Sequence, residues 1–136
     1  MSAFEIGLKA SRSKTFSAAD VEAFARLTGD MNPLHLDDTY AATTRFGKRI
    51  AHGMLTASLI SALIANDLPG PGSVYLKQTL SFVAPVYLGD TITAIAEVTA
   101  FRERSRVATL KTTCTNQEGI LVLEGEAIVM IPDRQV

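Results

Sequence analysis

The chain of 136 residues contains no tryptophan and only one cysteine. An internal disulfide is therefore excluded. Cys114 lies in the alternating run ATLKTTCT (108–115), and no histidine is near it in sequence. A buried structural thiol is a better interpretation of this pattern than a nucleophile, because nothing marks the sulfur as activated.

Long apolar runs are also missing. The longest, ASLISALIA (57–65), is about half of the roughly 20 residues that a membrane-spanning helix needs, so we expect no contact with a membrane. The first twenty residues lack the apolar core of a signal peptide, which predicts a cytoplasmic protein. With 13 Lys and Arg against 14 Asp and Glu, the chain has no basic excess for binding nucleic acid.

Helical patterns occupy the first half of the chain. Ser17 and Asp20 resemble a capping box, and Gly29 suits the end of that helix. The run DDTYAATT (37–44) could form a second, short helix. Residues 53–67 are apolar on nearly every face, which predicts a helix surrounded by protein and ended by LPGPGS.

Strand patterns follow from residue 74. Residues 74–88, 90–101, 106–116 and 120–131 are rich in β-branched side chains and are joined by short turns such as NQEG (116–119), and an earlier strand fits residues 4–16. Short connections imply antiparallel pairing. We expect an α+β fold in a single domain (1–136), with a curved sheet around the helix and edges that favour a homodimer.

The stretch GDMNPLHL (29–36) carries the strongest candidates for chemistry. Asn32 and Pro33 favour a turn that could bring Asp30 and His35 to one side of the backbone. A carboxylate and an imidazole that share one water form a general acid and base pair. An ordinary loop, with Asp30 bonded to the backbone and His35 half-exposed, remains the alternative at this point.

The second histidine precedes the apolar helix. The free N–H groups at Gly53, which has no side chain, could bind a carbonyl oxygen that gains negative charge. His52 could equally be a capping or packing residue, with Gly53 easing the turn. Ser58 and Ser61 lie inside the helix, where serines usually bond to its own carbonyls. No HExxH or paired cysteine pattern is present, and we expect no metal.

These motifs resemble a known family. DMNPLHLD, followed by FGKRIAHGMLTASLIS and LPGPGSVYLKQTLSFVAPVYLGD, is similar to the MaoC-like, or hydratase 2, family of (R)-specific enoyl-CoA hydratases. It looks most like the short single-domain members that supply polyhydroxyalkanoate synthesis. The resemblance implies a hot-dog fold, usually dimeric, in which a curved antiparallel sheet wraps around a long central helix, here residues 53–66.

The resemblance also implies roles for particular residues. Asp30 and His35 match the catalytic pair that holds the water added to a trans-2-enoyl-CoA, and Asn32 matches a position that supports the pair. The N–H of Gly53 matches the group that binds the thioester carbonyl, and Ser61 matches a position that orients the histidine. The product would be an (R)-3-hydroxyacyl-CoA, formed without a cofactor. Ile64 and Ile128 are predicted to border the acyl pocket from inward positions.

The sequence also allows other functions. A hot-dog thioesterase or an acyl-carrier-protein dehydratase would use the same fold, and a non-catalytic acyl-CoA-binding module would need neither Asp30 nor His35. The phosphates of the coenzyme require cations, for which Lys48, Arg49, Lys77, Arg102 and Arg104 are candidates.

Overall fold

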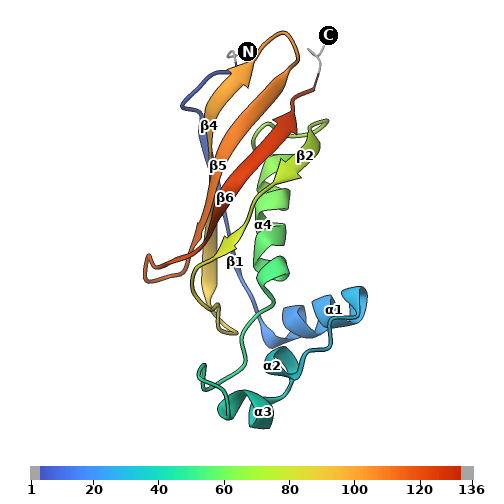
Figure 1. Cartoon of the computed structure of the whole chain (residues 1–136), viewed down its shortest axis with the longest axis vertical. Helices are drawn as coiled ribbons and strands as arrows, with labels where there is room; N and C mark the ends of the chain where they lie inside the picture. The colour runs from blue at the N-terminus through green and yellow to red at the C-terminus, as the bar shows by residue number, and fades with distance from the viewer. Residues whose placement is uncertain (1–3, 133–136) are drawn as a thin grey trace.

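The computed structural model describes residues 4–132, which form an antiparallel sheet with a long helix packed along it (Figure 1). The strands are β1 (Lys9–Thr15), β2 (Val74–Gln78), β3 (Ser81–Phe82), β4 (Thr91–Arg102), β5 (Val107–Thr115) and β6 (Leu121–Met130). The helices are α1 (Ala18–Thr28), α2 (Pro33–Leu36), α3 (Asp38–Ala42) and α4 (Gly53–Asn66). The sheet order is β1-β4-β5-β6-β2, and β3 also pairs with β6. Antiparallel pairing is confirmed at each of these contacts.

The short helices follow from local capping. The Asp20 N–H donates to Ser17 Oγ at 3.1 Å, and the Ser17 N–H donates to Asp20 Oδ2 at 3.0 Å. This capping box starts α1, and Gly29 ends it at a φ of 83°. The predicted helix after Asp37 is confirmed as α3. Where the sequence predicted only a turn, Asn32 caps the single turn of α2.

The strand pattern predicted for residues 90–101 is confirmed. Ile92, Ala94, Ala96 and Val98 are 0% exposed and face the core, while the side chains between them point to the other face of the sheet. Cys114 pairs with Ala94 on the inner face and is fully buried. Burial raises the pKa of its thiol to about 12, so Cys114 is a structural residue and not a nucleophile.

One prediction about α4 is wrong. Leu55, Leu59, Ile60, Leu63 and Ile64 are buried against the sheet, but the opposite face of the helix is exposed. The exposed side includes Met54, Ser58, Ser61 and Ala65. The protein therefore does not surround this helix, because the sheet of one chain covers only one side of it.

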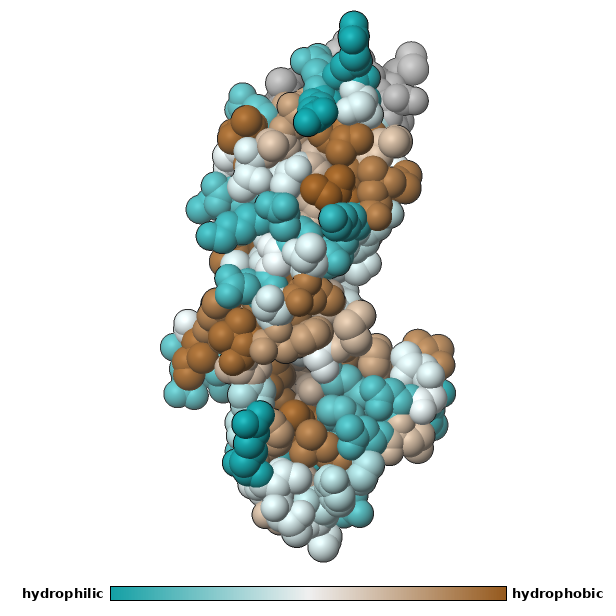
Figure 2. Space-filling model, viewed as in Figure 1, coloured by the Kyte–Doolittle hydropathy of each residue, from teal (hydrophilic) through white to brown (hydrophobic). Residues whose placement is uncertain are grey.

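The uncovered face of α4 continues onto the sheet edge. A hollow of about 440 Å³ separates α4 from β2, with Met54, Ser61, Tyr75 and Leu76 among its lining residues. Val74 and Leu76 on β2 are half-exposed. Figure 2 shows apolar side chains on the face of the molecule that carries β2.

The N-terminal end of α4 points toward the end of the molecule where α1, α2 and α3 gather (Figure 1). Within residues 4–132, no helix is both long enough and apolar enough to span a membrane.

Candidate functional site

A hollow of about 410 Å³ lies where the start of α4 meets the segment before α2. Asp30, His35, His52 and Gly53 all line it. Two segments therefore face a single space: one around α2, which carries Asp30 and His35, and one at the start of α4, which carries His52 and Gly53. The rest of the wall is mainly apolar. It comes from residues 82–86, from Val122 and Leu123 of β6, and from Arg45, Phe46, Ile50, Ala51, Met54 and Thr56.

The ring of His35 is held in one tautomer by the backbone. Its Nδ1 lies 2.8 Å from the carbonyl oxygen of Ile50, which only accepts hydrogen bonds, so Nδ1 carries the proton and donates. In the neutral ring, Nε2 then keeps a free lone pair. His35 is 8% exposed, and burial, together with the neighbouring His52, lowers its pKa. At neutral pH the ring is therefore uncharged and available as a proton acceptor.

His52 supports the same site from the other side. Its Nε2 donates to the backbone carbonyl of Asp30 at 3.1 Å, and its ring packs against that of His35 with centroids 3.9 Å apart. Because its Nε2 donates, its buried Nδ1 is an acceptor, and this atom has no hydrogen-bond partner among the described residues. His52 thus fixes the backbone position of Asp30 and the plane of His35.

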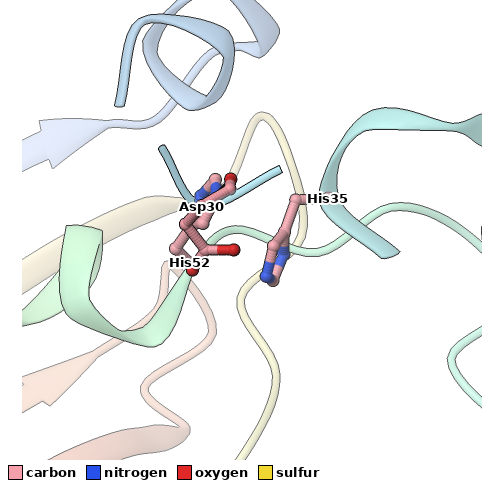
Figure 3. A group of neighbouring side chains, drawn as sticks. All are labelled: Asp30, His35 and His52. Carbon is pink, nitrogen blue, oxygen red and sulfur yellow. Dashed lines mark hydrogen bonds between the residues drawn. The ribbon is translucent and has the colours of Figure 1, made fainter. Parts of the chain in front are cut away.

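Asp30, His35 and His52 converge, as Figure 3 shows. Each offers a nitrogen or a carboxylate oxygen, and these atoms lie within 4.8 Å of one another. Two hydrogen bonds from one water span about 4 to 5 Å between their acceptors, so a single water fits between two of these groups. A metal ion could also bridge such a group, and the absence of a metal stays a prediction.

Gly53 lines the same hollow. Neither Gly53 nor Met54 donates its N–H to another group within residues 4–132, whereas the N–H groups of Leu55 and Thr56 bond to the His52 carbonyl. The ring of Phe82 lies against Gly53, and a Cβ built on Gly53 would come within 2.6 Å of that ring. Glycine therefore fits here without displacing the ring of Phe82, and its N–H is left without a partner at the wall of the hollow.

The structure places the other candidates as follows. Asn32 accepts from the Leu34 N–H at 3.0 Å and donates its own N–H to Asp30 Oδ1 at 3.3 Å, so it lies in direct contact with the site. Ser61 does not reach it within one chain. It lies two turns along α4 on the exposed face, in the hollow beside β2. Ser58 bonds to the Leu55 carbonyl, as expected of a serine inside a helix.

The two residues predicted for an acyl pocket are not brought together. Ile64 is 2% exposed and belongs to the core between α4 and the sheet. Ile128 pairs with Thr109 in the outer row of the sheet, whereas its neighbours Ala127 and Val129 face the core. The inward position predicted for Ile128 is therefore wrong, because the alternation of β6 turns its side chain to the opposite face.

Sequence reasoning missed several residues of the hollow, among them Thr56, Phe82 and Arg45. Thr56 is buried one turn after His52, and its Oγ1 has no partner among the described atoms. Its spacing of four residues from His52 on a helix was a usable signal. Phe82 and Arg45 come from β3 and from the loop after α3, and no local pattern predicts their approach.

Arg49, which the sequence offered as a phosphate ligand, is already engaged. Its Nε donates to the His35 carbonyl at 2.7 Å, and its guanidinium pairs with Glu22 at 3.5 Å. Its side chain is only 12% exposed. Arg49 therefore positions the segment that carries His35.

Known proteins are similar to this chain along most of its length. Residues 2–119 match the profile of the MaoC like domain. The (R)-specific enoyl-CoA hydratase of Aeromonas caviae is 56% identical over 94% of this chain and 96% of its own length. The Rhodospirillum rubrum protein of the same name is 50% identical over 94% of this chain and 88% of its own. A mitochondrial 3-hydroxyacyl-(acyl-carrier-protein) dehydratase of Solanum lycopersicum is 39% identical over 94% and 78%.

Solved structures show the same likeness. An (R)-hydratase from A. caviae, described as involved in PHA biosynthesis, matches with a TM-score of 0.93 and 54% identity over 97% of this chain and 100% of that one. An R-hydratase from Pseudomonas aeruginosa has a TM-score of 0.93 and 46% identity over 98% and 85%. The expected hot-dog fold is confirmed. Since the profile spans most of the chain and these relatives align along nearly all of it, the chain belongs to the MaoC-like domain family.

Proposed function

We propose that this protein hydrates trans-2-enoyl-CoA to (R)-3-hydroxyacyl-CoA. The observation that carries the proposal is the convergence of Asp30 and His35 in a hollow that is also lined by Gly53, whose N–H has no partner within residues 4–132. A base, an acid and an electrophilic donor are what the addition of water to an unsaturated thioester requires. The named relatives support the same substrate class and stereochemistry.

The water lies between Asp30 and His35. Both present acceptors, the carboxylate and Nε2, so one water donates a hydrogen to each and leaves an oxygen lone pair free. That lone pair attacks the β-carbon while the pair takes up the proton. The resulting acid returns a proton to the α-carbon. The same pair therefore serves as base and then as acid.

Gly53 polarises the thioester. When water adds to the β-carbon, the π electrons move toward the carbonyl, whose oxygen gains negative charge in an enolate-like state. The N–H of Gly53, at the positive end of α4, donates to this oxygen. Collapse of the enolate with protonation of the α-carbon completes the product. We assign Asn32 and His52 supporting roles through their contacts with Asp30.

The addition of water leaves the overall oxidation level of the substrate unchanged, because the β-carbon gains oxygen while the α-carbon gains hydrogen. The reaction therefore needs no redox cofactor, and we propose that it also uses no metal. We further propose a cytoplasmic enzyme that supplies monomers for polyhydroxyalkanoate, as the description of the A. caviae structure suggests for that protein. The chain would act as one domain over residues 1–136.

The working form would be a homodimer. The exposed face of α4 and the apolar edge strand β2 form one continuous surface, and an edge strand with free N–H and carbonyl groups pairs readily with a second copy. Ser61 lies on this surface. If Ser61 orients a catalytic histidine, that histidine would therefore belong to the second copy in the dimer.

The test follows the absorbance of the enoyl thioester as trans-2-butenoyl-CoA is hydrated, with chiral analysis of the product. Asp30→Asn and His35→Gln should each lose on the order of a hundredfold or more in kcat. Glu118→Gln, at an exposed carboxylate outside the hollow, is the control and should keep full activity. Normal turnover by Asp30→Asn would contradict the assignment.

A dehydratase acting on acyl-carrier-protein substrates is the second candidate, favoured by the Solanum lycopersicum relative. It would run the same chemistry in reverse on another carrier. Comparing kcat/KM for butenoyl thioesters of coenzyme A and of acyl carrier protein decides between the two. Release of free thiol from either substrate would instead indicate a thioesterase.

A further inference from the structure

Several cations of the described residues are already paired. Lys9, Arg12 and Lys14 form ion pairs with Glu97, Asp67 and Asp20, and Arg49 is bonded to the His35 carbonyl. Lys77 lines the separate hollow beside β2. Arg102 and Arg104 lie at the turn between β4 and β5, which Figure 1 places at the end of the molecule opposite α2 and α3. None of these cations faces the hollow that holds Asp30 and His35.

Arg45 does face it. This residue follows α3 and lines the same hollow as Asp30 and Gly53. Its guanidinium lies over the ring of Phe46, 4.9 Å from the ring centroid. Within residues 4–132, Arg45 forms no ion pair or side-chain hydrogen bond, and the side chain is exposed. A free, oriented guanidinium thus stands in the wall of the pocket.

Lys48 provides a contrast three residues away. Its ammonium group lies over the ring of Tyr87, 4.7 Å from the centroid, and it lines a neighbouring hollow with Asp90 and Glu118. The two hollows share the lining residues Ala84 and Pro85, but their charged lining residues differ. Two carboxylates, Asp90 and Glu118, would repel an anion in the hollow of Lys48. In the hollow of Arg45 the only carboxylate among the described lining residues is Asp30.

We propose that Arg45 binds the phosphate ester at the end of the pantetheine arm of the substrate, a group that coenzyme A and acyl carrier protein share. This inference rests on the proposed function. The planar guanidinium can donate two parallel hydrogen bonds to phosphate, and stacking on Phe46 limits the side-chain freedom that binding must remove. Arg45 lines the hollow from the loop after α3, and its side chain is exposed, so it can meet the far end of an extended arm while the thioester reaches Gly53.

The experiment compares three butenoyl thioesters: those of pantetheine, 4′-phosphopantetheine and coenzyme A. Arg45→Ala should lower kcat/KM about tenfold with the two phosphorylated substrates, mainly through KM, and leave the pantetheine thioester unchanged. Arg45→Lys should recover part of the loss, because it restores the positive charge but not the planar group that donates two parallel hydrogen bonds. Lys48→Ala is the matched control and should change none of the three values by more than about twofold.

Each outcome decides the proposal. An equal loss with pantetheine would mean that Arg45 shapes the pocket and does not bind phosphate. No loss with coenzyme A, or the same loss in Lys48→Ala, would also overturn the assignment. A loss confined to coenzyme A would place Arg45 on the nucleotide and not on the shared phosphate ester, and so would contradict it. If the parent protein hydrates none of the thioesters, the proposed function itself fails, which distinguishes the two.

Discussion

The imidazoles of His35 and His52 pack against each other at an interplanar angle of 32°, with centroids 3.9 Å apart, and each donates one N–H to a backbone carbonyl. The acceptors are Ile50 for His35 and Asp30 for His52. Both rings are thereby fixed in orientation and tautomer before any substrate binds. Because His35 Nε2 is left with a lone pair, the stack prepares a base beside the Asp30 carboxylate.

The protonation of His35 provides a direct test of this arrangement. Its pKa is lowered, first by burial, so the neutral ring persists to a lower pH in the folded protein than the ordinary value of 6.5. The unfolded chain binds the proton first, so this residue contributes to loss of stability as the pH falls below that value. An NMR titration of the ring protons should give a midpoint below 6.5. The spectrum of His35→Gln identifies the signal, and a midpoint above 6.5 would contradict the structure.

A side chain at Gly53 should disturb the site. In Gly53→Ala the new Cβ would approach the ring of Phe82 to 2.6 Å, and the start of α4 or the ring must move. A displacement of about 1 Å at a reaction centre can cost about a hundredfold in rate, and we expect a loss of that order in kcat.

Phe82→Leu in the same background tests the cause. The smaller side chain removes the ring atoms that the Cβ would meet, so activity should rise relative to Gly53→Ala alone. Phe82→Leu by itself is the control for changes in the pocket wall. If the double variant is no more active than Gly53→Ala, the collision with Phe82 is not the reason for the loss.

The proposed dimer depends on the β2 edge. Leu76 is 50% exposed on β2, and Leu76→Glu should convert a dimer into a monomer in sedimentation velocity, because it places a charge in the apolar contact. Ile120 is exposed to a similar degree, 49%, but lies after the turn that leads into β6. Ile120→Glu should leave the dimer intact. A monomeric parent protein, or equal effects of the two variants, would refute this interface.

The capping box of α1 predicts a dependence of stability on pH. The backbone bond from Ser17 is the largest cause that lowers the pKa of Asp20 below its ordinary value of 3.8. A lowered carboxyl pKa stabilises the folded state above that value, and the contribution is lost as the pH falls through the folded pKa. Asp20→Asn should therefore be less stable than the parent near neutral pH, and the difference should shrink in acid.

Chemical denaturation at several pH values measures this difference. Ser17→Ala removes the other half of the box and should cost about 1 kcal/mol of unfolding free energy at neutral pH. Glu118→Gln, at an exposed turn residue that caps no helix, controls for the loss of a charge. If the difference in unfolding free energy between Asp20→Asn and the parent stays constant down to low pH, the carboxylate does not act through its charge.

The sequence by itself determined the elements that depend on neighbours in the chain. The capping box of α1, the end at Gly29 and the alternation of β4 rest on spacings of one to four residues, and the structure confirms them. The pattern in 29–36 also singled out Asp30 and His35 without their partners, because Asn32 and Pro33 carry their own turn chemistry.

Only the tertiary structure decided which distant groups meet. Phe82 reaches Gly53 from β3, Arg45 enters the hollow from the loop after α3, and His52 Nε2 bonds to the Asp30 carbonyl 22 residues away. The outward direction of Ile128 and the uncovered face of α4 likewise depend on the register of β6 and on how far one sheet extends. Such contacts arise when packing closes the core, and a local pattern of residue types does not contain that information.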